Sequence, residues 1–183
     1  MPFISHPFVW LMRFRKRKGY GVHSPFAFNF ITDVIDATHP YYAYHELDRQ
    51  YSGWQRSLGG QAISKSRLLY RLVNHQRPER MLLCGASVVD ESYMLAAAPK
   101  ARRVGDIFDE KADFIYISQP DDSILYRHLH EGSMLVVDRL RDNMEWWRMI
   151  KADHRTRVTF DLYDLGIAFF DPKLQKQDYK VNW

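Results

Sequence analysis

Two hydrophobic patterns divide the chain near residue 80. The segments before this point have the period of amphipathic helices, whereas the runs MLLC, FIYIS and MLVVD that follow are short and continuously apolar. Such runs are typical of parallel strands that are buried on both faces. The intervening segments ESYMLAA, DDSILYRHLH and DNMEWWRMI are predicted to be crossover helices. We therefore expect a helical extension over residues 1–79 and an α/β domain over residues 80–183, together forming one compact unit.

Local signals place three helices in the extension. Ser24 is a suitable N-cap and Pro25 suits the first helical position, so HSPFAFNFITDVIDA is predicted to be a helix. YYAYHELDRQY and SKSRLLYRLVNH are the other two candidates. The last of these has one apolar stripe, formed by Leu68, Leu69, Leu72 and Val73. SGWQRSLGG, which lies between them, is predicted to be a glycine-containing loop.

The C-terminal region predicts an antiparallel hairpin. RVTFDLYDLGIAFF contains two β-rich runs that are joined through Asp164, Leu165 and Gly166. KQDYKVNW is a candidate for one last extended segment. The sheet is therefore expected to have about five strands, mostly parallel, and to end in this hairpin.

Composition favours a single packed domain. The chain has 183 residues, of which 46% are hydrophobic and 15% aromatic, and this content argues against disorder. Cys84 is the one cysteine, so an intrachain disulfide is excluded and a reducing, cytoplasmic location is expected. No run approaches the ~20 apolar residues of a membrane span, so we expect no transmembrane segment.

The positive charge is concentrated at the N-terminus. Residues 1–20 contain no acid and five of the 26 basic residues, and the rest of the chain is close to neutral. The basic residues are Arg13, Arg15, Lys16, Arg17 and Lys18. Because the apolar FVWLM precedes these charges, the segment does not have the order of a secretory signal. It is predicted either to contact an anionic membrane or nucleic-acid phosphates, or to pack as a helix with a solvated basic end.

Four segments carry a resemblance to a known family: GYGVHSPFAF, LLYRLVNHQRPERMLLCGAS, EGSMLVVDRL and VTFDLYDLGIAFFDPKLQKQDY. They resemble, in order, class I S-adenosylmethionine-dependent methyltransferases, and in particular a bacterial group with a similar glycine–histidine–serine–proline–phenylalanine segment. The resemblance implies a Rossmann-like fold with S-adenosylmethionine as cofactor. It also implies vestigial cofactor-binding positions at Gly85, Ser87 and Asp138. His23 and Asp138 are the candidates for a general base if the chain is active.

The sequence departs from this family where the cofactor binds. Leu83 and Val89 stand where the family has an acid and a second glycine. The chain between Pro99 and Asp113 is too short for the two βα units that the family places there. Strands two and three are therefore expected to be absent, or to survive as one fragment around Val104–Phe108. The family's strand order is then reduced to one, four, five, seven, six.

Two of the three metal ligands that the resemblance implies also have no counterparts, and Asp138 stands at the position of the third. Ser118 and Gln119 follow the fourth strand of the family pattern, and Arg139 replaces an amide ligand after the fifth. An arginine has no lone pair for a hard cation, so no metal site is predicted. His128 and His130 are two residues apart on an expected helix, so they point to opposite sides and are not expected to share a metal.

Asp138 is the strongest surviving site candidate, because it ends a strand at the edge where open α/β sheets bind ligands. A cap on the following loop, or a pair with Arg139 or Arg141, explains it equally well. Trp146 and Trp147 are predicted to pack in the core rather than to form an adenine-binding wall.

These observations predict a shortened, degenerate methyltransferase-like protein that has lost cofactor binding and catalysis and acts as a binding or scaffold protein. One alternative is an active S-adenosylmethionine-dependent methyltransferase whose pocket is rebuilt or completed by a partner. Another is a protein that binds membrane surfaces or nucleic acid through its basic N-terminal segment. The exposed edge of strand one is expected to be covered by the N-terminal helices, by a second copy of the chain or by a partner protein.

Overall fold

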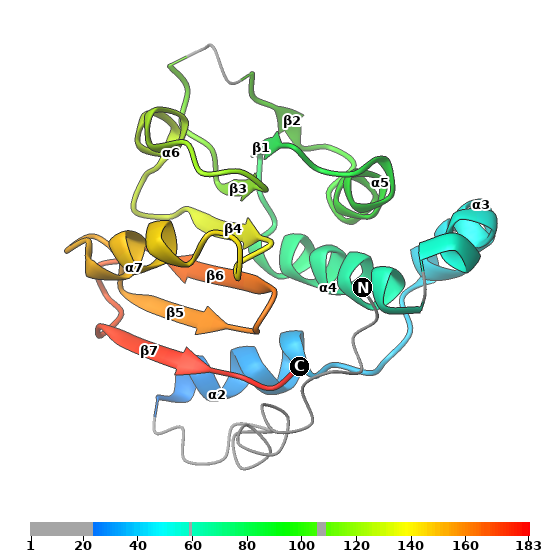
Figure 1. The fold of residues 1–183 in the computed structure, drawn as a ribbon, viewed down its shortest axis with the longest axis horizontal. Helices are drawn as coiled ribbons and strands as arrows, with labels where there is room; N and C mark the ends of the chain where they lie inside the picture. Colours follow the sequence, from blue (N-terminus) through cyan, green and yellow to red (C-terminus); the bar gives the residue numbers. More distant parts are fainter. Residues whose placement is uncertain (1–23, 59, 106–108) are drawn as a thin grey trace.

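A seven-stranded mixed sheet forms the centre of the protein (Figure 1). The computed structural model describes residues 24–183, apart from residue 59 and residues 106–108. The strand order is β2-β1-β3-β4-β6-β5-β7, and β6 runs antiparallel to both of its neighbours, whereas the other pairs are parallel. The strands are β1 Arg80–Cys84, β2 Arg102–Arg103, β3 Phe114–Ile117, β4 Met134–Asp138, β5 Val158–Asp161, β6 Leu165–Phe169 and β7 Gln177–Lys180.

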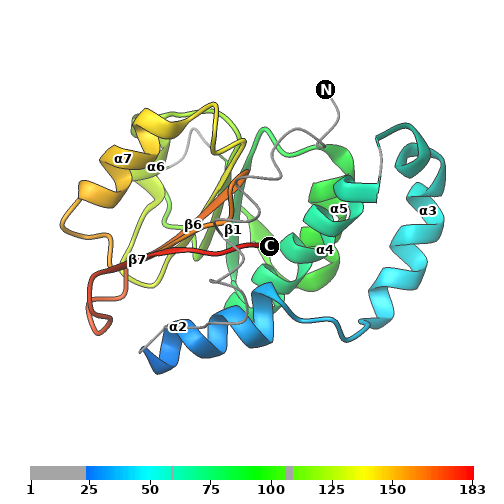
Figure 2. The same ribbon diagram turned by 60° about the horizontal axis from the view of Figure 1, so that its bottom comes forward.

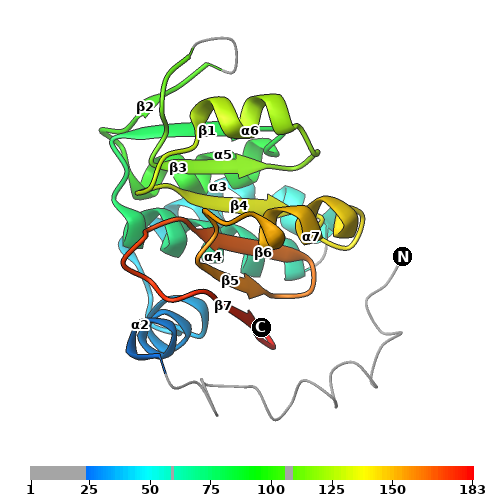
Figure 3. The ribbon, with the colours of Figure 1, turned by 90° about the vertical axis from the view of Figure 1, so that its left-hand side faces the viewer.

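The five expected strands have the predicted order, and the hairpin of β5 and β6 is confirmed. The sheet is larger than the five strands expected, because β2 and β7 extend it at its two edges (Figure 3). β7 confirms the last extended segment predicted in KQDYKVNW. The strand fragment expected around Val104–Phe108 is found at Arg102–Arg103 in the described part of the chain, and residues 106–108 lie outside that part. The chain pairs with β1 at this point because the N–H of Arg102 donates to Glu79 O at 2.8 Å and the N–H of Val104 donates to Met81 O at 2.9 Å.

The edge of β1 that was expected to be exposed is paired with β2. The prediction that N-terminal helices cover this edge is wrong, because those helices lie on one face of the sheet instead (Figure 2). Hydrophobic contacts account for this placement. The helical residues 25–35 and 60–76 bury apolar side chains against the broad face, where far more apolar surface is available than along a strand edge, and the helix between them packs on its neighbouring helices.

Helices cover both faces of the sheet. One face is covered by α2, η3, α4 and α5, with α3 packed outside α4 and α5, and the other face is covered by α6 and α7 (Figure 2). The helices are α2 Pro25–Phe30, the π-helix η3 Ile31–Ile35, α3 Tyr42–Leu58, α4 Gly60–Gln76, α5 Val88–Ala97, α6 Asp122–His128 and α7 Met144–Ala152. Side chains along each strand alternate between the two cores. In β3, Phe114 and Tyr116 belong to the core under α4, whereas Ile115 and Ile117 belong to the core under α6 and α7.

The start of the first described helix follows the sequence signals. The Ser24 hydroxyl accepts from the Ala27 N–H, and Pro25 occupies the first turn. Phe30 packs into the core with its ring centroid 4.9 Å from that of Phe160 and 5.0 Å from that of Phe169. These aromatic contacts fix the N-terminal helical segment to the C-terminal hairpin, so the two ends of the described chain share one core.

The predicted loop SGWQRSLGG is largely helical, and this prediction is wrong. α3 continues through Leu58 and α4 begins at Gly60. A glycine within a helix costs only about 1 kcal/mol relative to alanine, and good helix formers such as Gln55 and Arg56 surround Gly53. The helix therefore continues past Gly53 to Leu58.

Within the described part of the chain, no helix is both long enough and apolar enough to cross a membrane.

Candidate functional site

The carboxyl ends of β1, β3 and β4 lie at one edge of the sheet, because these three strands are parallel. This edge is where open α/β sheets bind their ligands. Four charged or polar side chains from four different elements meet here. We call them the Lys65 cluster, and they are Lys65 of α4, Asp90 of α5, Tyr116 of β3 and Asp138 of β4.

Lys65 lies at the centre of the cluster. Its Nζ is 2.9 Å from Oδ2 of Asp90 and 3.0 Å from Oδ2 of Asp138. The carboxylates come from the first turn of α5 and from the end of β4, so one ammonium joins the helical face to the sheet. Both carboxylates are buried, and the lysine side chain is 29% exposed. The arrangement therefore replaces water around two buried anions with one cation from the same chain.

The Asp90 carboxylate is hydrogen-bonded on both oxygens. Ser66 Oγ donates to Oδ1 at 2.7 Å, and Ser87 Oγ donates to Oδ2 at 2.8 Å. Ser87 is also the N-cap of α5, and it accepts the Asp90 N–H at 3.1 Å. Ser87 therefore has the helix-start role that its sequence position predicted, and it fixes an acid of the cluster in addition.

Asp138 is held in a similar way. Tyr116 donates its hydroxyl to Oδ2 at 2.5 Å, and the Arg139 N–H donates to Oδ1 at 2.9 Å. The predicted pairing with a guanidinium is wrong, because the cationic partner is Lys65. The Arg139 side chain instead bonds to Asp142, and the Arg141 guanidinium stacks on an aromatic ring. Both arginines therefore have other partners, and the ammonium that contacts Asp138 comes from α4.

The pKa values of Lys65 and Tyr116 are both raised, through the combined effects of burial and the two carboxylates of the cluster. Burial lowers the pKa of Lys65, but the adjacent charges of Asp90 and Asp138 outweigh it and raise the pKa above its ordinary value. Burial, together with the negative charge of Asp138, raises the pKa of the Tyr116 hydroxyl. At neutral pH the lysine is therefore an ammonium, and the tyrosine keeps its proton and acts as a hydrogen-bond donor. Tyr116 is consequently unsuited to act as a general base.

The turn after β1 is closed as well. Gly85 has φ +73°, a left-handed conformation that glycine adopts without strain. A Cβ at this position would collide with Oγ of Ser118, which follows β3. The Asn143 amide donates to the carbonyls of Ser118, Asp138 and Arg139 at 3.2–3.4 Å, and so holds the ends of β3 and β4 together. The space beside the glycine is thus filled by the chain's own atoms.

The structure separates the other candidates that the sequence singled out. Leu83 packs against the core that lies under α2 and α4, and Val89 packs against the cluster between α3, α4 and α5. His128 bonds to the carbonyl of Glu110, whereas His130 bonds to a carboxylate oxygen of Asp113, so each ring has its own partner. In the described ranges, no three histidine, cysteine, aspartate or glutamate side chains are grouped so as to hold a metal ion.

Some predictions concern residues beyond the described part of the chain. His23 and the five basic residues of the N-terminal segment lie there. Their roles as a general base and as an anion-binding segment stay predictions.

Both tryptophans of α7 are buried in the core under α6 and α7, as predicted. Trp147 is fully buried, and the Trp146 indole N–H donates to Asp122 at 2.6 Å. A cavity of ≈ 400 Å³ adjoins Trp146 and is rimmed by Asp122, Asp142 and Glu145. Asp122 already accepts the indole N–H and Asp142 already pairs with Arg139, so the acidic rim is largely committed to internal contacts.

Sequence reasoning found Asp138 and Ser87 but missed Lys65, Asp90 and Tyr116. Lys65 has the pattern of an ordinary polar position on a helix, and Asp90 that of an acid favoured in a first helical turn. Tyr116 lies within an apolar strand run, where its hydroxyl gives no signal of its own. The one available signal was the polar end of MLVVD, which marks the edge of the sheet where the other residues converge.

Comparison with known proteins gives no assignment. A scan against protein-family models matches no family, and a search of curated proteins finds no match. Lys65 is held by two anions, both oxygens of each carboxylate are engaged, and the tyrosine is a donor. The arrangement is suited to joining α4, α5 and the sheet.

Proposed function

We propose that this protein is a non-catalytic relative of class I methyltransferases that acts as a binding or scaffold protein. The observation that carries the proposal is the position of Lys65 Nζ between the carboxylates of Asp90 and Asp138. These carboxylates lie where a cofactor of the resembled family would meet the carboxyl ends of the strands. An internal ammonium already pairs with both anions there.

The loop after β1 supports the same conclusion. A cofactor loop presents free backbone N–H groups and open space beside its glycines. Here the space beside Gly85 is occupied by Ser118, and the Ser87 hydroxyl is engaged with Asp90. A bound nucleoside would have to displace these contacts, and its binding energy would be reduced by their loss.

The competing proposal is an active methyltransferase whose pocket is rebuilt or completed by a partner. Asp138 favours it, because a buried carboxylate at the strand edge is the group that a general base requires. In that case Lys65 has to move away when the cofactor binds. Two further proposals concern other surfaces. One is membrane or nucleic-acid binding through the basic N-terminal segment, and the other is a homo-oligomer or a partner protein at the strand-one side of the sheet.

Thermal melting with S-adenosylmethionine or its demethylated product distinguishes the two main proposals. A ligand at 100 times its dissociation constant adds about 2.7 kcal/mol. For a chain of this size, that free energy raises the melting midpoint by roughly 5–10 °C. The non-catalytic proposal predicts no shift for the wild-type protein. A saturable shift, lost in Gly85→Val, would support the methyltransferase instead.

A further inference from the structure

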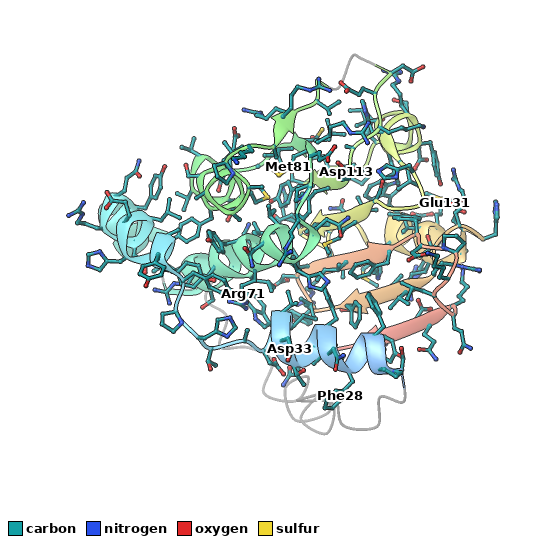
Figure 4. The ribbon with its side chains drawn as sticks, turned by 180° about the vertical axis from the view of Figure 1, so that it is seen from behind. Phe28, Asp33, Arg71, Met81, Asp113 and Glu131 are labelled. Carbon is teal, nitrogen blue, oxygen red and sulfur yellow. The ribbon has the colours of Figure 1, made fainter. Side chains whose placement is uncertain are left out.

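A second site lies away from the Lys65 cluster. A cavity of ≈ 320 Å³ is formed between the π-helix η3 and the C-terminal half of α4. Figure 4 shows Asp33 on the first of these elements and Arg71 on the second, at neighbouring positions on the same side of the molecule. The cavity is at the small end of the ~300–1,000 Å³ range of ligand pockets.

Arg71 brings a buried positive charge to this cavity. Its side chain is 7% exposed, and its Nε and one terminal nitrogen donate to the carbonyls of Val34 and Ile35 at 2.6 and 2.8 Å. Helix-end carbonyls carry together about half a negative charge, so they satisfy the donors without cancelling the full charge. Among the described residues, no carboxylate forms an ion pair with Arg71 within 4 Å. A partly desolvated charge of this kind favours an anion nearby.

The remaining wall supplies further donors. Arg77 follows α4 in a left-handed conformation, φ +49°, and Asn74 lies one turn before it. The structure gives neither side chain a hydrogen-bonding partner in the described part of the protein. Partial burial and the charge of Arg77 lower the pKa of His75, so its ring is neutral near pH 7 and offers one N–H.

Asp33 is the acid on the rim of this cavity. Its carboxylate is exposed and accepts the hydroxyl of Thr32 at 2.9 Å. Two arginines against one exposed acid leave the cavity with a net positive charge. Tyr41 closes another side with an aromatic ring.

We propose that this cavity binds a small molecule through an oxyanion group, a phosphate or a carboxylate, placed between Arg71 and Arg77. Guanidinium groups bind both oxyanions with paired hydrogen bonds, so the two sources share one recognition chemistry. The site is separate from the carboxyl edge of the sheet, so it does not depend on the function proposed above.

Calorimetric titration of the full chain with inorganic phosphate and with acetate, at constant ionic strength in chloride, tests this proposal. We expect saturable binding of at least one anion. Tighter binding of phosphate identifies a phosphate ligand, and tighter binding of acetate identifies a carboxylate. Arg77→Gln should weaken binding about tenfold, because it removes a charge-assisted hydrogen bond. Asp33→Asn should strengthen it about threefold by removing an exposed like charge.

Arg148→Gln is the matched control, because Arg148 is an exposed arginine on α7, across the sheet from the cavity. It should leave binding unchanged, and the melting midpoint of each variant shows that it is folded. Buried Arg71 is left intact, since its loss would also disturb folding. The proposal is overturned if neither anion gives saturable heat, or if Arg77→Gln binds as tightly as Arg148→Gln.

Discussion

The Lys65 cluster makes a quantitative prediction about stability. Lys65→Ala removes the ammonium and leaves the carboxylates of Asp90 and Asp138 buried without their cation. Removal of one partner from a buried ion pair typically costs about 3–5 kcal/mol, because the remaining charge is uncompensated. The lysine side chain is 29% exposed, so some solvent screening applies and we expect a loss near the lower limit, about 3 kcal/mol.

Urea unfolding at neutral pH measures this loss directly, and thermal melting should show the midpoint falling by roughly 6–12 °C. The matched control is Arg49→Ala, which removes an ion pair with Glu46 in which both side chains are about two-thirds exposed. Such surface pairs contribute about 0–1 kcal/mol. Adding Asp138→Asn to Lys65→Ala removes one of the unpaired charges and should restore part of the lost stability.

The pH dependence gives an independent check. The pKa of Lys65 is raised in the folded protein, so its stabilising contribution is fully present below the unfolded value of about 10.4. The contribution is lost as the pH rises through the folded pKa. The difference in unfolding free energy between wild type and Lys65→Ala should therefore narrow at alkaline pH. A loss below about 1 kcal/mol at neutral pH, similar to that of an exposed pair, would refute the reasoning.

Three further predictions concern single features of the fold. Hydrogen bonds from Arg155 lower the pKa of Asp153 to about 2, so Asp153→Asn should destabilise the protein at neutral pH, and this difference in unfolding free energy should vanish as acid titration approaches pH 2. Gly85→Ala should lower the free energy of unfolding by about 1–2 kcal/mol because of the positive φ, and by a further amount because the new Cβ overlaps Ser118. In urea unfolding, adding Ser118→Ala should restore only the loss that is due to the overlap. Phe30→Ala should cost about 3–5 kcal/mol, because it empties the core between α2 and the hairpin; a loss under 1 kcal/mol would contradict that packing.

The strands were predictable because their signal is local. Continuous apolar runs such as MLVVD are explained by burial on both faces, and the structure places them in the centre of the sheet. The two edge strands were predicted less fully. β7 lies in KQDYKVNW, which was a candidate extended segment without an assigned partner strand. β2 has two residues and is exposed, so its pairing with β1 arises from the path of the chain after α5 and leaves no hydrophobic pattern.

The candidate site was only partly predictable, for a different reason. Asp138 was found because the end of a strand is visible in the sequence. Lys65 and Asp90 contact Asp138 although the three residues belong to elements that are far apart in the chain. A helical period predicts which face of a helix is apolar, but it does not predict which polar residue of that helix reaches the end of a strand. The loop prediction over residues 52–60 was wrong because isolated glycines are weak helix breakers when good helix formers surround them.

The chain's own Lys65 lies between Asp90 and Asp138, where the parallel strands end. A crystal structure of the protein grown with saturating S-adenosylhomocysteine tests it most directly. We predict that Lys65 Nζ contacts both Asp90 and Asp138 and that no nucleoside lies beside Gly85. Density for the nucleoside at that turn, with Lys65 displaced from the two carboxylates, would contradict it.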